Sequence, residues 1–480
     1  MNRSRLTLAV VCAATAMLML DIAVVNTAVP SIARDLHAGF QSIQWIVDAY
    51  TVALAATVLT AGSLADRLGR RRSFGFGLVL FTITSAACGA APTIGALDAF
   101  RAVQGVGAAV MFATSFALIR DAYPDPASRG GAFAAYGATI GASFAVGPLV
   151  GGVLTSWLDW RAIFLLNVPI GIAALAVLRR IHDGREQQGR PIDWAGQATL
   201  VSGLLALVTA LLRGNESGWS STEIETLLAV AVLSLTAFTV VQFRSRAPML
   251  PPVLFRNPSF TGAQVAAFAI SASFFAQFVY ASLYLQNILG LSPIRTGLAF
   301  MPATVVLFVV SGMTAQFQAR VSARTLITGG LVLVTGGLVA MLPTSAHSHW
   351  YVMLPGLVIA SIGTGLFNPA LSAVVLREAD ADNAGLAAGV NDTARQGGIA
   401  VGVAALGALV PSAGAFGGAH AVAFVHGLQH ATIVAAVVAG VGAVASAVLI
   451  DRKTRKAGTT GTTAEVIELA DDLAPVMSVA

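Results

Sequence analysis

The feature that most restricts the fold of this chain is a series of long apolar segments that alternate with short polar ones. A helix needs roughly 20 mainly apolar residues to cross a bilayer. Fourteen segments meet this requirement: residues 6–29, 43–63, 73–91, 94–119, 131–156, 162–179, 194–212, 224–243, 260–284, 296–317, 325–343, 350–376, 384–410 and 429–450. Only 11% of all residues are charged, against roughly 25% in soluble proteins. We therefore expect an all-α membrane protein with fourteen transmembrane helices.

The positive charges indicate how these helices are oriented. Residues 62–72 (GSLADRLGRRR) hold four arginines and one aspartate between two apolar segments, so they must lie at a membrane face. Arg-rich short loops are typical of the cytoplasmic face. If both termini are cytoplasmic, 22 of the 28 Lys and Arg residues lie on that side and four on the other. The net charge of +5 is therefore explained by arginines in the cytoplasmic loops of a cell-membrane protein, and it does not indicate nucleic-acid binding.

The polar connections divide the chain into four parts. Residues 1–181 hold six spans, and residues 182–258 are a linker that carries an inserted two-helix hairpin. Residues 259–456 hold six more spans. A Gly/Thr-rich tail with four acidic residues, 457–480, is predicted to be mobile.

Five stretches carry a resemblance to a known family. They are 20–30 (LDIAVVNTAVP), 62–72, 101–107 (RAVQGVG), 147–152 (GPLVGG) and 160–171 (WRAIFLLNVPIG). Together with the 6+2+6 layout they resemble the major facilitator superfamily, in its fourteen-span drug:proton antiporter branch, although Ala23 stands where threonine is usual. The resemblance implies two six-helix bundles plus a two-helix hairpin. It also implies export of amphipathic, aromatic or cationic drugs and antibiotics in exchange for protons, by alternating access.

The charged stretch between the second and third spans has separable parts. Gly62 and Gly69 are expected to allow a tight turn with positive φ. Asp66 is expected to pair with one of its neighbouring arginines or with a helix N-terminus. Arg67 and Arg70 belong to the same stretch. The resemblance implies that these residues form a cytoplasmic gate that latches the two bundles. The alternative is that the arginines only fix topology and contact anionic lipid, which does not explain the aspartate.

The fifth span carries Gly147, Pro148, Gly151 and Gly152. Small residues allow a neighbouring helix to approach closely, and the proline removes one helical hydrogen bond. The resemblance implies a leak-tight helix wall that favours exchange. Ordinary tight packing of helices is the alternative.

Charged residues inside spans are expected to function or to be paired, because placing a charge at mid-membrane is costly. By their depth, Asp21, Asp48 and Arg101 share the outer part of one bundle. An arginine that faces one or two carboxylates forms an ion pair that protonation breaks, so these three residues are the candidates for proton coupling. In a rival pairing, Asp98 bonds Arg101 three residues along the same helix.

Two further groups are candidates. Asp392 and Arg395 are also three residues apart and form either a local ion pair or a second gate to the N-terminal bundle. Among the aromatic residues of the ninth and tenth spans, Phe275, Phe278 and Tyr280 suit a large apolar substrate. The alternative is that some of these aromatic side chains face lipid.

Other functions find no support in the sequence. It has no phosphate-binding loop of the GxxxxGK[ST] type, so direct drive by ATP is not expected. We also expect no enzyme activity, no cofactor, no metal site and no nucleic-acid partner. Alternatives that stay open are a proton-driven exporter of one endogenous metabolite, a proton symporter, and a membrane sensor or scaffold.

Overall fold

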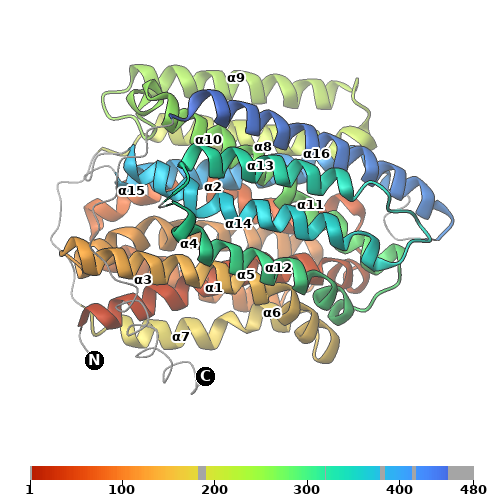
Figure 1. Cartoon of the computed structure of the whole chain (residues 1–480), viewed down its shortest axis with the longest axis horizontal. Coiled ribbons are helices and arrows are strands. Elements are labelled where there is room, and N and C mark those ends of the chain that lie inside the picture. The colour runs from red at the N-terminus through yellow and green to blue at the C-terminus, as the bar shows by residue number, and fades with distance from the viewer. Residues whose placement is uncertain (1–2, 182–190, 319, 379–383, 413–417, 452–480) are drawn as a thin grey trace.

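The structure, a computed structural model, describes residues 3–181, 191–318, 320–378, 384–412 and 418–451. All the regular secondary structure in these ranges is helical, and the long helices lie side by side (Figure 1). The first half comprises α1 (Arg3–Asp35), α2 (Phe40–Leu68), α3 (Arg70–Gly89), α4 (Ile94–Ala122), α5 (Pro126–Trp157), α6 (Ala162–Leu165), α7 (Asn167–Leu178), α8 (Trp194–Ser217) and α9 (Thr222–Arg244). The second half comprises α10 (Pro258–Ile270), η2 (Ser271–Phe275), α11 (Ala276–Leu283), η3 (Tyr284–Ile288), α12 (Pro293–Gln318), α13 (Ala323–Ala340), α14 (Leu354–Arg377), α15 (Ala384–Gly407) and α16 (Ala421–Leu449), with short 3₁₀ turns between some of them.

Each of the fourteen expected spans coincides with a helical segment. In the described ranges, twelve helical segments are long and apolar enough to cross a membrane. The sixth span is the pair α6–α7, and the thirteenth is α15, whose apolar character is interrupted by polar residues such as Asn391 and Gln396. The expected fourteen-helix membrane fold is confirmed.

The helices extend beyond the apolar segments that predicted them. The first was expected at 6–29 and runs from Arg3 to Asp35, and the last begins at Ala421 rather than at residue 429. Apolar composition marks only the part of a helix that lies within the hydrocarbon layer of the membrane. The backbone hydrogen bonds of the helix continue beyond it into the polar ends. Side-chain caps then fix where several spans begin: Thr93, Asp125, Asp193, Ser221, Asn257 and Ser322 each accept a hydrogen bond from a backbone N–H of the first turn.

The ninth span is not a single α-helix. Two π-helical turns, η2 and η3, interrupt it on either side of α11. Wide turns of this kind are rare and frequently occur at functional sites. The sequence analysis expected an unbroken helix here, because hydropathy does not distinguish the two backbone geometries.

The helices form two bundles that meet along two seams. In the first bundle, α4 packs against α2 and α3 while α1 packs against α5; in the second, α14 packs against α12 and α13 while α16 packs against α10 and α13. The seams are the contacts of α2 with α15 and of α5 with α12. We call the end of the molecule that holds Arg70 and the start of α1 the charged end, and the opposite end the far end.

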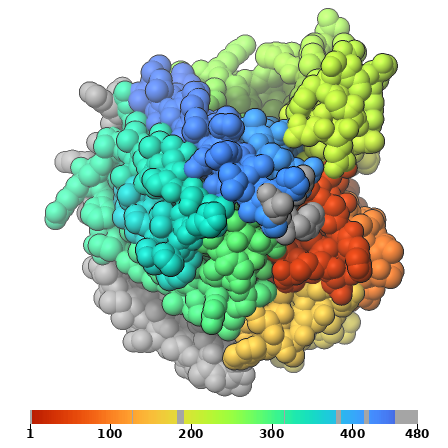
Figure 2. Space-filling model, turned by 90° about the vertical axis from the view of Figure 1, so that its right-hand side faces the viewer, coloured from red at the N-terminus to blue at the C-terminus, as the bar shows by residue number. Residues whose placement is uncertain are grey.

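The inserted hairpin lies over the first seam. Helix α8 contacts both α2 and α15, and α9 packs on the outside of α8. Figure 2 shows this hairpin in yellow-green at the rim, beside both the red N-terminal and the blue C-terminal helices. Thr60 of α2 donates a hydrogen bond to Gln197 of α8, and Asn215 of α8 donates to the Ala408 carbonyl at 2.5 Å. The hairpin is thus attached to both bundles.

Candidate functional site

A buried ion pair between Asp21 and Arg101 lies in the core of the first bundle. A terminal nitrogen of Arg101 on α4 is 2.5 Å from Oδ2 of Asp21 on α1. Arg101 is 1% exposed and Asp21 is 2% exposed, so water does not screen the pair. Such a pair persists only when its remaining hydrogen-bonding capacity is satisfied.

The carboxylate of Asp21 accepts hydrogen bonds from donors on three sides. The amide Nδ2 of Asn167 lies 3.2 Å from Oδ1 and the amide Nε2 of Gln104 lies 3.1 Å from it, while Arg101 holds Oδ2. Ser85 connects the two amides, since its hydroxyl accepts from both. A proton added to either oxygen would face a donor, so this arrangement fits ionised Asp21. A proton on Oδ2 would remove the negative charge and weaken the charge-assisted hydrogen bond from Arg101.

The guanidinium of Arg101 is fixed from the other side as well. Its Nε donates to the Ile46 carbonyl at 3.0 Å, and one terminal nitrogen donates to Oε1 of Gln104 at 2.7 Å. The ring of Tyr50 lies 4.3 Å from the guanidinium carbon. Arg101 therefore links α4 to α1 and α2 and occupies a defined position.

The other two acids near this depth do not join the network. Among the described residues, Arg101 forms its ion pair with Asp21 and none with Asp98, so the rival pairing is wrong. Asp48 is fully buried, yet neither of its carboxyl oxygens has a hydrogen-bond partner among the described residues. The expected cluster of Asp21, Asp48 and Arg101 is therefore a pair and a separate acid.

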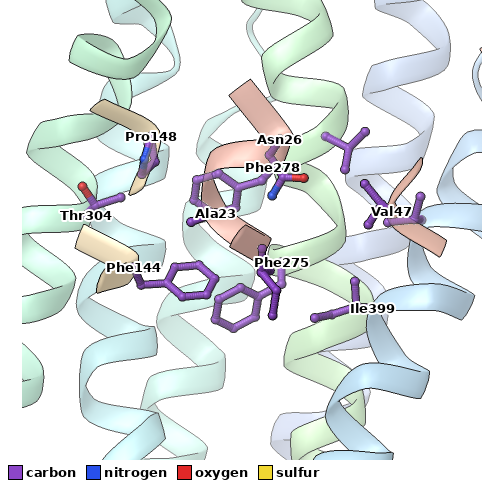
Figure 3. A pocket seen from close by; sticks show the side chains of 12 residues that line it. Ala23, Asn26, Val47, Phe144, Pro148, Phe275, Phe278, Thr304 and Ile399 are labelled. Atoms are coloured by element: carbon purple, nitrogen blue, oxygen red, sulfur yellow. The ribbon is translucent and has the colours of Figure 1, made fainter. Parts of the chain in front are cut away.

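A small cavity lies between the two bundles (Figure 3). It is lined by Ile22, Ala23, Asn26, Val47, Phe144, Pro148, Phe275, Phe278, Val279, Thr304, Ile399 and Val403. Its volume of about 30 Å³ holds only a few water molecules. Asn26 and Thr304 are its polar side chains, and the rest of the wall is apolar or aromatic. Since Ala23 lines the cavity and is two residues from Asp21, the carboxylate points away from it, behind α1.

The aromatic candidates have different positions. Phe275 and Phe278 line the cavity, and Phe144 of α5 packs edge-on against Phe275 with ring centres 5.4 Å apart. Tyr280 does not line it. The Tyr280 hydroxyl donates to the Val403 carbonyl and accepts a 2.8 Å hydrogen bond from Gln44, so it joins the two bundles instead.

The pair Asp392 and Arg395 does not form the expected local ion pair within the described part of α15. The Arg395 guanidinium instead lies 5.9 Å from the centre of the Phe275 ring. Arg395 precedes the cavity residue Ile399 by one helical turn and therefore shares its face of α15.

The three glycines of residues 147–152 on α5 sit where neighbouring helices approach closely. A Cβ added at Gly147 would lie 2.4 Å from the Ala23 side chain, and one at Gly151 would lie 2.8 Å from the Val24 carbonyl, both on α1. At Gly152 the added atom would be 2.6 Å from the Pro293 carbonyl of the second bundle. The same stretch therefore packs α5 against its own bundle and against the opposite one.

Gly152→Val is predicted to impair closure at the far end of the α5–α12 seam. The extra side chain meets backbone atoms, which cannot rotate away, and overpacking of this kind costs about 1–3 kcal/mol. That free energy corresponds to a roughly 5- to 150-fold shift between closed and open forms. Transport rate in proteoliposomes measures the effect. Gly137→Val on the same helix is the control, because nothing lies within 4 Å of its added Cβ, and equal rates for both variants would contradict the prediction.

The charged stretch is a junction of two helices rather than an extended turn. Gly69, with φ +94°, is the one non-helical residue between α2 and α3, so the expected positive φ occurs there. Gly62 lies inside α2, and the expectation that it forms part of the turn is wrong. The α2 helix continues to Leu68 because its backbone hydrogen bonds are uninterrupted up to the glycine.

Arg70 is the centre of the polar contacts at this junction. It bonds both oxygens of Asp121 on α4, at 2.6 and 2.7 Å, and Oδ1 of Asp66 at 3.2 Å. Arg71 donates to the Leu178 carbonyl on α7. In contrast, Arg67 is exposed. These contacts tie α2, α3, α4 and α7 together within the first bundle.

Several members of these networks were not assigned a role from sequence. Gln104 and Asn167 are polar partners of Asp21, Ser85 accepts hydrogen bonds from both of these amides, and Asp121 is the main partner of Arg70. Their polarity in or beside apolar segments was a usable signal. Sequence spacing could not identify their partners, because every one of these contacts joins different helices.

Comparison with known proteins gives consistent matches over most of the chain. The sequence profile of the Major Facilitator Superfamily matches residues 11–403. The chain is 36% identical over 468 residues to the puromycin resistance protein pur8 of Streptomyces alboniger, covering 95% of this chain and 93% of that protein. It is 32% identical to the multidrug resistance protein Stp of Mycobacterium tuberculosis, covering 85% and 76%, respectively.

Solved structures show the same fold at low sequence identity. The crystal structure of the human organic anion transporter MFSD10 superposes with a TM-score of 0.63 at 15% identity, over 92% of this chain and 99% of that one. At this identity the likeness concerns the fold alone.

Proposed function

We propose that this chain, which belongs to the Major Facilitator Superfamily, exports amphipathic organic compounds in exchange for protons. Membership of this family makes it a multi-pass membrane transporter of small molecules rather than an enzyme. The two bundles would rock about the cavity between them, so that it opens alternately to each side. The proton gradient would drive the cycle without a cofactor. The membrane would be the cell membrane, with both termini and the charged end in the cytoplasm, as the arginine distribution favours.

The observation that carries proton coupling is the set of donors around Asp21. Arg101, Gln104 and Asn167 all donate to the carboxylate, so ionised Asp21 holds α1 against α4 and α7. Protonation weakens the bond from Arg101 and frees α1 to move. Since Ala23 and Asn26 on α1 line the cavity, a shift of this helix changes the substrate site. In this way a proton bound at Asp21, outside the cavity, alters substrate binding inside the cavity.

The cavity supports the proposed substrate class. Phe144, Phe275 and Phe278 provide aromatic surfaces, and Asn26 and Thr304 are the polar side chains of the lining. Such a wall suits aromatic or cationic amphiphiles bound without strict geometry. The names of the relatives, which denote puromycin resistance and multidrug resistance, agree with this class.

The gate at the charged end would be the group around Arg70. Asp66 and Asp121 hold Arg70 at the end of the first bundle, where the second bundle would dock during the outward-facing part of the cycle. Asp392 and Arg395 would form a further polar contact on the facing surface of α15.

The test uses purified protein in proteoliposomes that contain a pH-sensitive dye, with an imposed proton gradient. Puromycin and a panel of lipophilic aromatic cations are added in turn. We expect substrate-dependent proton movement with at least one compound, in the direction opposite to that of the substrate. Movement in the same direction would favour a symporter and overturn the proposal.

A second candidate is a dedicated exporter of one endogenous metabolite. The relatives favour it because some are named for resistance to one antibiotic, such as puromycin. The breadth of the substrate panel separates the two: a drug exporter moves several unrelated amphiphiles, whereas a dedicated exporter moves one compound and its close analogues.

A further inference from the structure

Asp48 lies on the face of α2 that forms the seam with the second bundle. One turn before it, Gln44 donates to Tyr280 and to the Val403 carbonyl. One turn after it, Val52 packs in an apolar cluster with Val208 and Leu212 of α8 and with Ala400 and Ala404 of α15. Residues four apart on a helix share a face. Asp48 is therefore enclosed between α15, α11 and the hairpin helix α8.

No donor in this enclosure reaches the carboxyl group. Asp48 is 0% exposed and both of its oxygens lack a hydrogen-bond partner among the described residues. The polar groups nearest along the seam are already engaged, because the Tyr280 hydroxyl donates to Val403 and the Gln44 amide donates to Tyr280. The closed seam thus offers an ionised carboxylate neither water nor a cation.

The charged groups of the first bundle are on the opposite side of α2. Ile46 and Tyr50, which contact Arg101, are each two residues from Asp48, so they project about 200° away around the helix. Arg101 is held there by Asp21. Near the depth of Asp48, the other titratable side chains of the first bundle are Asp98 on α4 and Cys88 on α3, and Tyr280 lies on α11. Residues 400–407 of α15 and 204–212 of α8 contain none; Asp392 and Arg395 lie further along α15, and Arg213 and Glu216 lie toward the end of α8. The Tyr280 hydroxyl is the titratable group that faces Asp48.

These positions have a direct physical consequence. An unpaired ionised carboxylate in an apolar enclosure is far costlier than a neutral carboxyl group. Ionised Asp48 can be solvated only when α2 and α15 separate and water enters the seam, or when Tyr280 gives up its bond to Val403. Neutral Asp48 fits the seam as it stands.

We propose that Asp48 is a second proton-binding site, separate from Asp21, and that its neutral form is required for the far end to close. Proton uptake at Asp48 from the open far end allows the α2–α15 seam to form, and loss of that proton favours reopening. This inference rests on the proposed alternation between two open faces. It assigns Asp48 to the seam itself, and Asp21 to the core of the first bundle.

The test measures far-end opening directly and needs no substrate. Spin labels are attached at Pro92→Cys, between α3 and α4, and at His347→Cys, between α13 and α14, both exposed at the far end. The background carries Cys12→Ala and Cys88→Ala. Distance distributions are recorded by double electron–electron resonance in lipid nanodiscs at pH 5.5 and pH 8.5. We expect the share of long distances to rise several-fold at the higher pH, and Asp48→Asn to keep the short distance at both.

Two further variants make the result decisive. Asp98→Asn is the matched control, since Asp98 is another acid within a span with an unpartnered oxygen, and it should keep the pH response. Asp48→Glu should restore the response that Asp48→Asn removes. A pH response that persists in Asp48→Asn, or a wild type without one, would overturn the inference. Because no substrate is present, a failure of drug-coupled proton transport leaves this result unaffected, so the two proposals fail separately.

Discussion

Asp21→Asn is expected to abolish substrate-driven proton movement, with a drop of roughly 100-fold or more, while the protein still folds. Asparagine has nearly the shape of the protonated acid but carries no exchangeable charge. The asparagine amide has one acceptor oxygen and one NH2 donor group. The NH2 group must therefore face either Arg101 or the amides of Gln104 and Asn167, all of which donated to the carboxylate. The variant therefore imitates the protonated state. The dye-loaded proteoliposome assay measures the loss.

The matched control is Asp35→Asn at the end of the same helix. Asp35 accepts hydrogen bonds from Trp160 and Arg161 at the protein surface, outside the buried network. It should keep near wild-type coupling. Substrate binding, followed by tryptophan fluorescence, should persist in Asp21→Asn even though coupling is lost. Full proton movement in Asp21→Asn would remove Asp21 from the coupling path.

Arg101→Ala is expected to destabilise the fold by about 3–5 kcal/mol, because removing one partner of a buried pair leaves the other charge uncompensated. The guanidinium also bonds the Ile46 carbonyl and the Gln104 side chain, so its loss leaves further buried polar groups unsatisfied. Thermal unfolding in detergent or nanodiscs measures the change. The effect should be partly reversed in the double variant with Asp21→Asn, where no charge remains.

Arg161→Ala serves as the control for loss of an arginine. Arg161 pairs with Asp35 and Asp159, but its side chain is 33% exposed, and exposed pairs contribute only about 0–1 kcal/mol. A similar loss of stability in Arg161→Ala and Arg101→Ala would mean that burial of the pair is not what matters. No recovery in the double variant would mean that packing, and not charge, is the main contribution of Arg101.

The membrane fold and the identity of the buried charged residues could be predicted from sequence because both depend on local composition. A run of about 20 apolar residues must cross the bilayer, and a charge inside such a run must be paired or functional, whatever its neighbours. That reasoning located all fourteen spans and singled out Asp21, Asp48 and Arg101. The conformational freedom of glycine predicted a positive φ at Gly62 and Gly69, and Gly69 alone of the two adopts it.

Partner choice was decided only by the tertiary structure. Composition and spacing allowed Arg101 to bond Asp98, Asp48 or Asp21, and the packing of α4 against α1 selected Asp21. The direction in which Asp48 points, toward the second bundle, depends on how α2 meets α15 and α8. These contacts join residues far apart in sequence, and local hydropathy holds no information about them. The sequence by itself thus determined which groups must be buried in the membrane, whereas tertiary packing decided that, within the described part of the chain, Asp21 is paired and Asp48 is not.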